Sequence, residues 1–219
     1  MKPTGLGGVW DDRGLLWTRN AVPGTKVYAE PLRLFKGTEY RGWSAWRSKL
    51  AALVARDRRI PWFTPSDNVL YLGAASGTTV SHLSDLLPEG AVYAVEFSPR
   101  SMRDLAWNAE PRANIVPILE DAGAPARYAA YIGPHVDALV QDVAQRHQVA
   151  IFLRNLPFLR SGGKGYLFVK ARSISVASSP GDIYRDVERQ LTEAGLKILK
   201  QVDLDPFEKD HRAFVVEKP

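Results

Sequence analysis

The feature that most constrains the fold is an alternation, from residue 69 onward, of short apolar runs with stretches of helical periodicity. Strands buried on both faces of a parallel sheet read as continuous apolar runs. Strands that alternate with helices indicate a doubly wound α/β fold, because parallel neighbours need a crossover connection. Five runs follow this pattern: Val69–Leu72, Val92–Val95, Ile115–Leu119, Val136–Val140 and Tyr166–Val169.

Two further apolar runs, Ile198–Leu204 and Ala213–Val216, end the chain and are joined by a short polar loop. A connection this short makes the two strands antiparallel neighbours. We therefore expect a Rossmann-like α/β fold with a seven-stranded, mostly parallel sheet. Helices are expected at Val80–Leu87, from Ser98 onward, at Gln148–Leu159 and at Asp182–Ala194.

The first 60 residues follow a different pattern, with short candidate strands separated by glycine-containing turns. These strands are Val9–Trp10, Leu15–Thr18 and Lys26–Tyr28. From Gly42 to Arg59, apolar residues recur at three- and four-residue steps, which predicts a helix. We expect a small antiparallel β domain with its connecting helix over residues 1–55, and the α/β domain over residues 56–219.

The composition excludes several kinds of chemistry. The chain has no cysteine, so disulfides, iron–sulfur ligation and thiolate catalysis are ruled out. Its four histidines show no metal-ligand spacing, and we expect no metal. No apolar stretch approaches the ~18 residues of a membrane span, and the N-terminus has no apolar run typical of a signal peptide. We expect a soluble, intracellular protein.

Positive charge is concentrated near the N-terminus. Residues 1–60 hold twelve Lys and Arg against five Asp and Glu, whereas the remaining residues hold seventeen against nineteen. Arginine, which outnumbers lysine, makes bidentate contacts to phosphate. The asymmetry indicates a polyanionic partner near this end, with an ordinary solvated basic surface as the alternative.

The loop after the first parallel strand runs from Gly73 to Thr79. Its two glycines permit a tight turn, and Thr78 and Thr79 open the next helix with hydroxyls and free amides. The loop matches neither the dinucleotide-binding nor the P-loop pattern. It is either a plain strand–helix turn or part of a ligand site, since ligands of such sheets lie beyond the carboxyl ends of the strands.

An acidic residue follows each of the next three strands. These positions are Glu96-Phe97, Glu120-Asp121-Ala122 and Asp142-Val143-Ala144-Gln145. A carboxylate in the place of Glu96 can accept hydrogen bonds from ribose hydroxyls, or it can favour the dipole of the following helix. Together the acids predict an electronegative rim suited to a nucleoside that carries positive charge.

Two lysines are candidates for chemistry. Lys170 directly follows the fifth strand and is expected to lie close to Asp142. Lys49 lies in the predicted helix before the sheet. The alternatives are a lysine that extends to solvent at a strand end and a solvated helix lysine.

Seven stretches, in order along nearly the whole chain from about Val22, together resemble fibrillarin. They are Tyr40–Trp43, Arg47–Ala52, Val69–His82, Val92–Ser98, Asp142–Gln145, Phe168–Ala171 and Phe207–His211. The resemblance implies a class I methyltransferase fold and an S-adenosylmethionine-dependent RNA 2′-O-methyltransferase that acts on rRNA and tRNA. It also implies a compact archaeal form, which would place the protein in the cytoplasm.

The resemblance further implies partners and site residues. The partners are a Nop-type scaffold protein, a kink-turn-binding ribosomal-type protein and a box C/D guide RNA with its substrate; a homodimer of the free chain is left open. The implied cofactor contacts are Gly73, Thr78, Thr79, Glu96, Phe97, Asp121, Ala122, Asp142, Val143, Ala144 and Gln145. The implied catalytic residues are Lys49, Asp142, Lys170 and His211.

A ribose hydroxyl is a poor nucleophile, so methyl transfer needs in-line placement and a group that takes the departing proton. We assign Lys170 as the proton acceptor or polariser and Lys49 as the contact to substrate ribose or phosphate. Two alternatives remain: a nicotinamide-dependent oxidoreductase, and a structural ribonucleoprotein subunit without catalysis.

Overall fold

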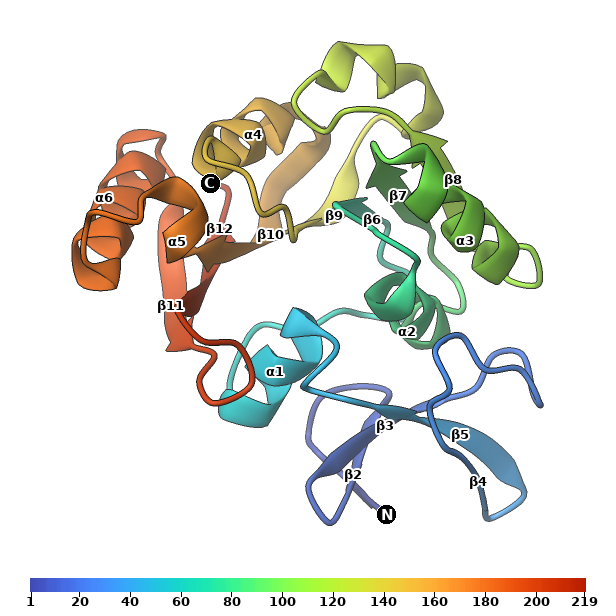
Figure 1. Ribbon diagram of the computed structural model, residues 1–219. Helices are drawn as coiled ribbons and strands as arrows, with labels where there is room; N and C mark the ends of the chain where they lie inside the picture. The colour runs from blue at the N-terminus through green and yellow to red at the C-terminus, as the bar shows by residue number, and fades with distance from the viewer.

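The computed structural model describes residues 1–219 and contains two β-sheets (Figure 1). The N-terminal sheet has five antiparallel strands in the order β1-β2-β3-β5-β4. It lies against the part of the molecule that holds α1 and α2. Its strands are β1 (Lys2–Pro3), β2 (Val9–Asp12), β3 (Leu15–Arg19), β4 (Leu32–Phe35) and β5 (Thr38–Trp43).

Two predictions for this region are wrong. Lys26–Tyr28 is not a strand, because the N–H groups of Val27 and Tyr28 donate to the Glu30 carboxylate instead of to a neighbouring strand. The helix predicted for Gly42–Arg59 is limited to α1 (Lys49–Arg56). Trp43 belongs to β5 and is completely buried, so the apolar periodicity extends across a strand and a turn before the helix begins.

The second sheet confirms the expected seven-stranded, mostly parallel architecture. Its order is β11-β12-β10-β9-β6-β7-β8. Strands β6 to β10 pair with one another in parallel, and β12 is antiparallel to both β10 and β11. The strands are β6 (Val69–Leu72), β7 (Val92–Glu96), β8 (Ile115–Leu119), β9 (Val136–Gln141), β10 (Leu159–Lys170), β11 (Lys197–Asp203) and β12 (His211–Glu217).

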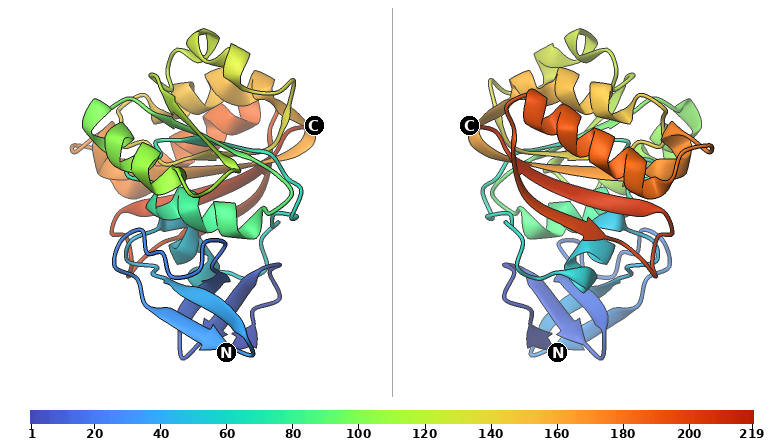
Figure 2. Two further views of the ribbon diagram at one scale, coloured as in Figure 1. Left: turned by 90° about the vertical axis from the view of Figure 1, so that its right-hand side faces the viewer. Right: turned by 90° about the vertical axis from the view of Figure 1, so that its left-hand side faces the viewer.

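Helices cover both faces of this sheet. The remaining helices are α2 (Thr78–Leu86), α3 (Pro99–Ala109), α4 (Gln148–Asn155), α5 (Ala171–Ile174) and α6 (Pro180–Glu193), with 3₁₀ turns at Pro125–Arg127, Ala129–Tyr131 and Leu156–Phe158. Figure 2 shows α6 crossing one face of the sheet. No helix has the length and apolarity needed to cross a membrane.

Each face of the large sheet has its own apolar core. One core is formed with α4 and α6 and includes Phe152 and Val187. The other is formed with α1, α2 and α3, and it also takes in Leu16 and Trp43 from the N-terminal sheet. Because these side chains share one continuous core with the large sheet, the N-terminal sheet is fixed in place beside α1 and α2.

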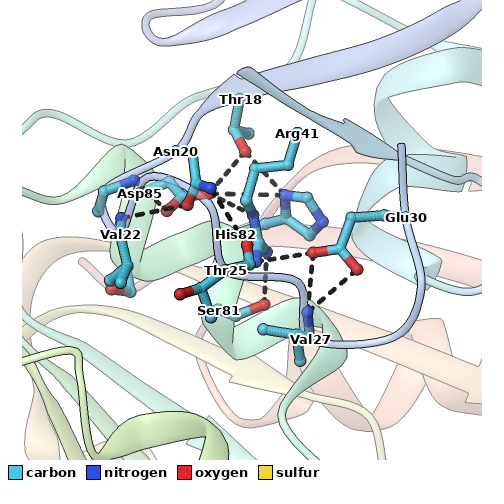
Figure 3. A network of polar contacts seen from close by, with 12 residues as sticks. Thr18, Asn20, Val22, Thr25, Val27, Glu30, Arg41, Ser81, His82 and Asp85 are labelled. Atoms are coloured by element: carbon cyan, nitrogen blue, oxygen red, sulfur yellow. Dashed lines mark hydrogen bonds and ion pairs between the residues drawn. The ribbon is translucent and has the colours of Figure 1, made fainter. Parts of the chain in front are cut away.

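A network of buried charges reinforces this contact (Figure 3). The Arg41 guanidinium of β5 lies 2.9 Å from the carboxylates of both Glu30 and Asp85, and it donates to the Ser81 hydroxyl at 2.6 Å. Arg112 contacts the other oxygen of Asp85 at 2.7 Å. All four charged side chains are fully buried, so each depends on the others to offset its lost hydration.

His82 lies within this network. Its Nδ1 is 2.8 Å from the Thr18 hydroxyl, and its Nε2 is 2.7 Å from the Tyr28 hydroxyl. Burial, together with the positive charges of Arg41 and Arg112, lowers the pKa of His82 well below its ordinary value. The imidazole is therefore neutral in the folded protein at neutral pH.

Acid is expected to destabilise the fold through His82. Its imidazole takes up a proton near pH 6.5 when unfolded but only at lower pH when folded, so the unfolded chain binds more protons below about pH 6.5. The contribution of His82 to the free energy of unfolding is therefore fully present above about pH 6.5 and is lost as the pH falls below that value. We expect His82→Gln to reduce the slope of unfolding free energy against pH, measured by urea titration between pH 6.5 and 5. The exposed His135→Gln is the control, and equal slopes for the His82 variant and the wild type would refute the prediction.

Candidate functional site

A cavity of about 270 Å³ opens where β6, β7, β8 and β9 end at one edge of the large sheet. This is the edge at which ligands of open α/β sheets bind. The cavity brings together residues from the ends of four strands and the loops that follow them. The lining residues are Gly73, Ala75, Val95, Glu96, Phe97, Glu120, Asp121, Ala122, Asp142, Val143, Ala144 and Gln145.

Gly73 allows two of these loops to approach each other. It has a φ of +85°, and a Cβ at this position would lie 2.4 Å from the backbone oxygen of Asp142. Only glycine is compatible with both the left-handed backbone and this close approach. The wall of the cavity therefore depends on this residue.

Glu96 and Phe97 provide two different contacts at the cavity. The Glu96 carboxylate is buried and accepts 2.8 Å hydrogen bonds from the N–H groups of Ala75 and Ser98. These bonds fix its orientation and leave further lone pairs for a ligand hydroxyl. Phe97 is 66% exposed beside it and offers a ring face to a planar ligand group.

Thr78 and Thr79, two of the predicted cofactor contacts, are not among the cavity-lining residues. The Thr79 hydroxyl is buried and donates to the Ser48 hydroxyl at 3.0 Å. Ser48 in turn accepts from the N–H of Ala51 as the N-cap of α1. Thr79 thus joins the start of α2 to the residue that precedes Lys49.

The second part of the site is an ion pair at the rim of the cavity. Lys49, at the start of α1, places its Nζ 2.9 Å from Oδ1 of Asp142 and 3.9 Å from Oε1 of Glu208. Burial acts to lower the pKa of the Lys49 ammonium. The charge and hydrogen bond of Asp142, with help from Glu208, outweigh burial and raise that pKa above its ordinary value. Lys49 therefore remains a cation.

From the sequence, Lys170 is expected to lie close to Asp142. In the structure the partner of Asp142 is Lys49, and Lys170 forms no ion pair. Lys170 ends β10, directly opposite His211 on β12. The side-chain nitrogen of Lys170 is thereby free for a substrate, while the backbone N–H of Lys170 donates to the Gln148 side chain.

His211 is nearly buried, and its Nδ1 lies 2.8 Å from the backbone oxygen of Lys209. A carbonyl can only accept, so Nδ1 carries the proton and Nε2 of the neutral ring retains a lone pair. Burial lowers the pKa of His211, and the nearby charges of Lys49 and Lys170 lower it further. The structure thus brings all four predicted catalytic residues to one cluster.

Glu208 was missed by the sequence analysis. Its two carboxylate oxygens face different residues of the cluster, one toward Lys49 at 3.9 Å and the other toward Nδ1 of His211 at 3.8 Å. The available signal was its position three residues before His211, inside one of the stretches that resemble fibrillarin.

Comparisons with known proteins show what this chain is similar to. The family model described as Fibrillarin matches residues 8–219. A fibrillarin-like rRNA/tRNA 2′-O-methyltransferase from Methanosarcina barkeri is 48% identical over 211 residues, which cover 94% of this chain and 92% of that protein. The structure of Aeropyrum pernix fibrillarin with natively bound S-adenosyl-L-methionine has a TM-score of 0.83 and 45% identity, over 92% and 88% of the two chains. A fibrillarin/Nop5p complex has a TM-score of 0.90 and 36% identity, over the full length of both chains.

Proposed function

This chain belongs to the fibrillarin family, and on that premise we propose that it methylates the ribose 2′-hydroxyl of rRNA and tRNA with S-adenosylmethionine as methyl donor. The observation that supports this function best is the Lys49–Asp142 ion pair at the rim of the cavity. It places an anion beside the cavity and a permanent cation beside that anion. A cationic donor and an anionic RNA acceptor require these two charges side by side.

The cavity suits this cofactor on three grounds. Glu96 has lone pairs free for the ribose hydroxyls, and Phe97 offers a ring face to adenine. Asp121 and Asp142 add negative charge to the cavity wall, which suits a sulfonium cation. The remaining predicted contacts, Gly73, Ala122, Val143, Ala144 and Gln145, also line the cavity. When bound, the cofactor supplies an electrophilic methyl group.

We assign the chain's own residues as follows. Asp142 holds the Lys49 ammonium, and Lys49 contacts the phosphate or ribose of the acceptor and fixes its position. As the neutral amine, Lys170 accepts the proton of the 2′-hydroxyl and becomes an ammonium, and as an ammonium it only polarises that hydroxyl; the neutral His211 lies directly opposite on the next strand. Transfer of that proton makes the oxygen a competent nucleophile without requiring a metal.

The proposal includes the setting in which the chain acts. We propose that it is the catalytic subunit of a box C/D ribonucleoprotein in an archaeal cytoplasm, with a Nop-type scaffold, a kink-turn-binding protein and a guide RNA. The chain's net charge of only +5 supports this, because weak RNA binding by the free chain leaves site selection to the guide. Residues 1–55 and 56–219 are proposed as the N-terminal domain and the methyltransferase domain.

The direct test is a methyl-transfer assay with tritiated S-adenosylmethionine, run with and without scaffold protein and guide RNA. Incorporation into RNA is expected in the complete assembly, at the guided nucleotide. Replacing that nucleotide by its 2′-deoxy form should abolish incorporation. Incorporation that persists on the deoxy acceptor would refute 2′-O-methylation, and efficient site-specific transfer by the chain alone would refute the guide-dependent setting.

A variant of Glu96 tests the cofactor assignment. Glu96→Gln retains the shape of the side chain but replaces one acceptor oxygen by a donor. We expect the Kd for S-adenosylmethionine, measured by isothermal titration calorimetry, to rise about tenfold, as for loss of one hydrogen bond to a charged group. Glu110→Gln, at the exposed end of α3, is the control. An unchanged Kd for the Glu96 variant would place the cofactor ribose elsewhere.

A further inference from the structure

Trp46 is exposed, unlike three other tryptophans in the first third of the chain. Its side chain is 64% exposed, whereas Trp17 and Trp43 are buried and Trp62 packs against the core. It lies in the turn between β5 and α1, three residues before Lys49. A single exposed aromatic ring is common, and Trp107 is 77% exposed on α3, so the feature that distinguishes Trp46 is its position beside a functional lysine.

The Trp46 ring is held by the loop that also carries Glu208. Its centroid lies 5.1 Å from that of Phe207, and the two ring planes are 73° apart. The next residue in that loop, Glu208, contacts Lys49. The turn before α1 and the loop between β11 and β12 therefore meet at two adjacent points, an aromatic pair and an ion pair. Figure 1 shows this loop beside α1. The aromatic pair is thus a direct neighbour of the cluster that includes Lys49.

The charges beside the aromatic pair are of both signs, but the anions Glu208 and Asp210 already face the cations Lys49 and Arg172. Arg47 and Lys209 flank the aromatic pair in sequence, and both side chains are exposed. Neither forms a salt bridge, and the Arg47 guanidinium lies over the Tyr28 ring at 5.4 Å. Exposed cations without anionic partners beside an exposed aromatic ring are the elements with which proteins bind single nucleic-acid strands.

We propose that Trp46, held edge-to-face by Phe207, receives a nucleotide of the acceptor RNA strand beside the ribose that is methylated. Arg47 and Lys209 contact the flanking phosphates. The inference rests on the proposed function, because that function puts RNA at the Lys49 cluster. A protein partner is less suitable, since Trp46 is a single exposed side chain with charged residues next to it in sequence, not part of a wide apolar patch.

The first test observes Trp46 directly. The full chain, labelled with 5-fluorotryptophan and saturated with S-adenosylhomocysteine, is titrated at low salt with an acceptor oligoribonucleotide. Trp46→Phe and Trp107→Phe assign the two ¹⁹F resonances. The Trp46 resonance is expected to shift or broaden with RNA, while that of Trp107, which is 77% exposed on α3, stays unchanged. No change at Trp46, or a change only when the scaffold protein is added, would overturn the proposal.

The second test measures kinetics in the assembled ribonucleoprotein. Trp46→Ala should raise KM for the substrate RNA about 5- to 100-fold, as for loss of one base-stacking contact, without changing the Kd of the cofactor. Trp46→Phe should restore KM, and Trp107→Ala should have no effect. An unchanged KM for Trp46→Ala would overturn the inference while leaving the proposed function intact. If instead the wild-type assembly transferred no methyl group, the function would fail, and the ¹⁹F titration would still decide whether Trp46 contacts RNA.

Discussion

Asp142→Asn is expected to lower the rate of methyl transfer at least ~100-fold, even at saturating cofactor and RNA. The substitution removes the anion that holds the Lys49 ammonium at 2.9 Å. Lys49, about one-fifth exposed, then retains only Glu208 at 3.9 Å and can leave the position from which it contacts the acceptor. The negative charge that faces the cationic methyl donor is lost as well. Single-turnover rates with tritiated cofactor in the assembled ribonucleoprotein measure the effect.

The control is an aspartate of β9, the strand that Asp142 follows. Asp137 lies near the opposite end of β9, where it pairs with Arg160 at 2.7 Å and accepts from the N–H of Asn68. Asp137→Asn is therefore expected to leave the transfer rate close to that of the wild type. If Asp142→Asn retained a rate similar to that of this control, the cluster would have no role in the reaction.

The largest effect on stability is expected for Arg41→Ala. The substitution leaves the carboxylates of Glu30 and Asp85 buried without this cation, and loss of one partner from a buried ion pair costs about 3–5 kcal/mol. In a chain of this size such a loss lowers Tm by roughly 10 °C. Differential scanning calorimetry, together with urea titration, measures both quantities.

Arg185→Ala provides the comparison, because this exposed arginine of α6 pairs only with Asp182 of the same helix. Exposed pairs contribute about 0–1 kcal/mol, so little change in Tm is expected. A similarly small change for Arg41→Ala would mean that the buried network does not fix the N-terminal sheet in place.

The sequence predicted the parallel strands well because burial on both faces leaves an uninterrupted apolar signal. The expected runs at Val69–Leu72 and Ile115–Leu119 coincide with β6 and β8. Strand β10 begins at Leu159, earlier than predicted. Its first half was missed by the sequence analysis because that half contains polar residues and glycines instead of an apolar run. That half departs from regular pairing with β9, and such irregular edges carry no apolar signal.

The N-terminal sheet was harder to predict for a different reason. Strand β5 contains Arg41, and a charged residue normally indicates an exposed position. Its burial depends on Asp85 of α2 and Glu30, partners that only the tertiary structure brings to it. A reading of local periodicity cannot anticipate such long-range compensation.

In the candidate site, too, the features that follow from strand order were predicted, and those that depend on tertiary contacts were not. The acids and glycine that follow the parallel strands were found because topology gathers strand ends at one edge. Strand adjacency indicated that Lys170 lies close to Asp142, but the ion pair of Asp142 with Lys49 depends on where α1 packs, which local sequence does not specify. Glu208 escaped notice because its relation to Lys49 depends on how the β11–β12 loop folds over the start of α1.

A crystal structure of the chain with S-adenosylmethionine and an acceptor ribonucleotide would decide whether the two halves of the site work together. The predicted complex has the donor's adenosine between Glu96 and Phe97, its methyl carbon about 3–3.5 Å from the 2′-oxygen, and the side-chain nitrogens of Lys49 and Lys170 around that ribose. A donor bound in the same cavity with its methyl group turned away from both lysines would contradict the account.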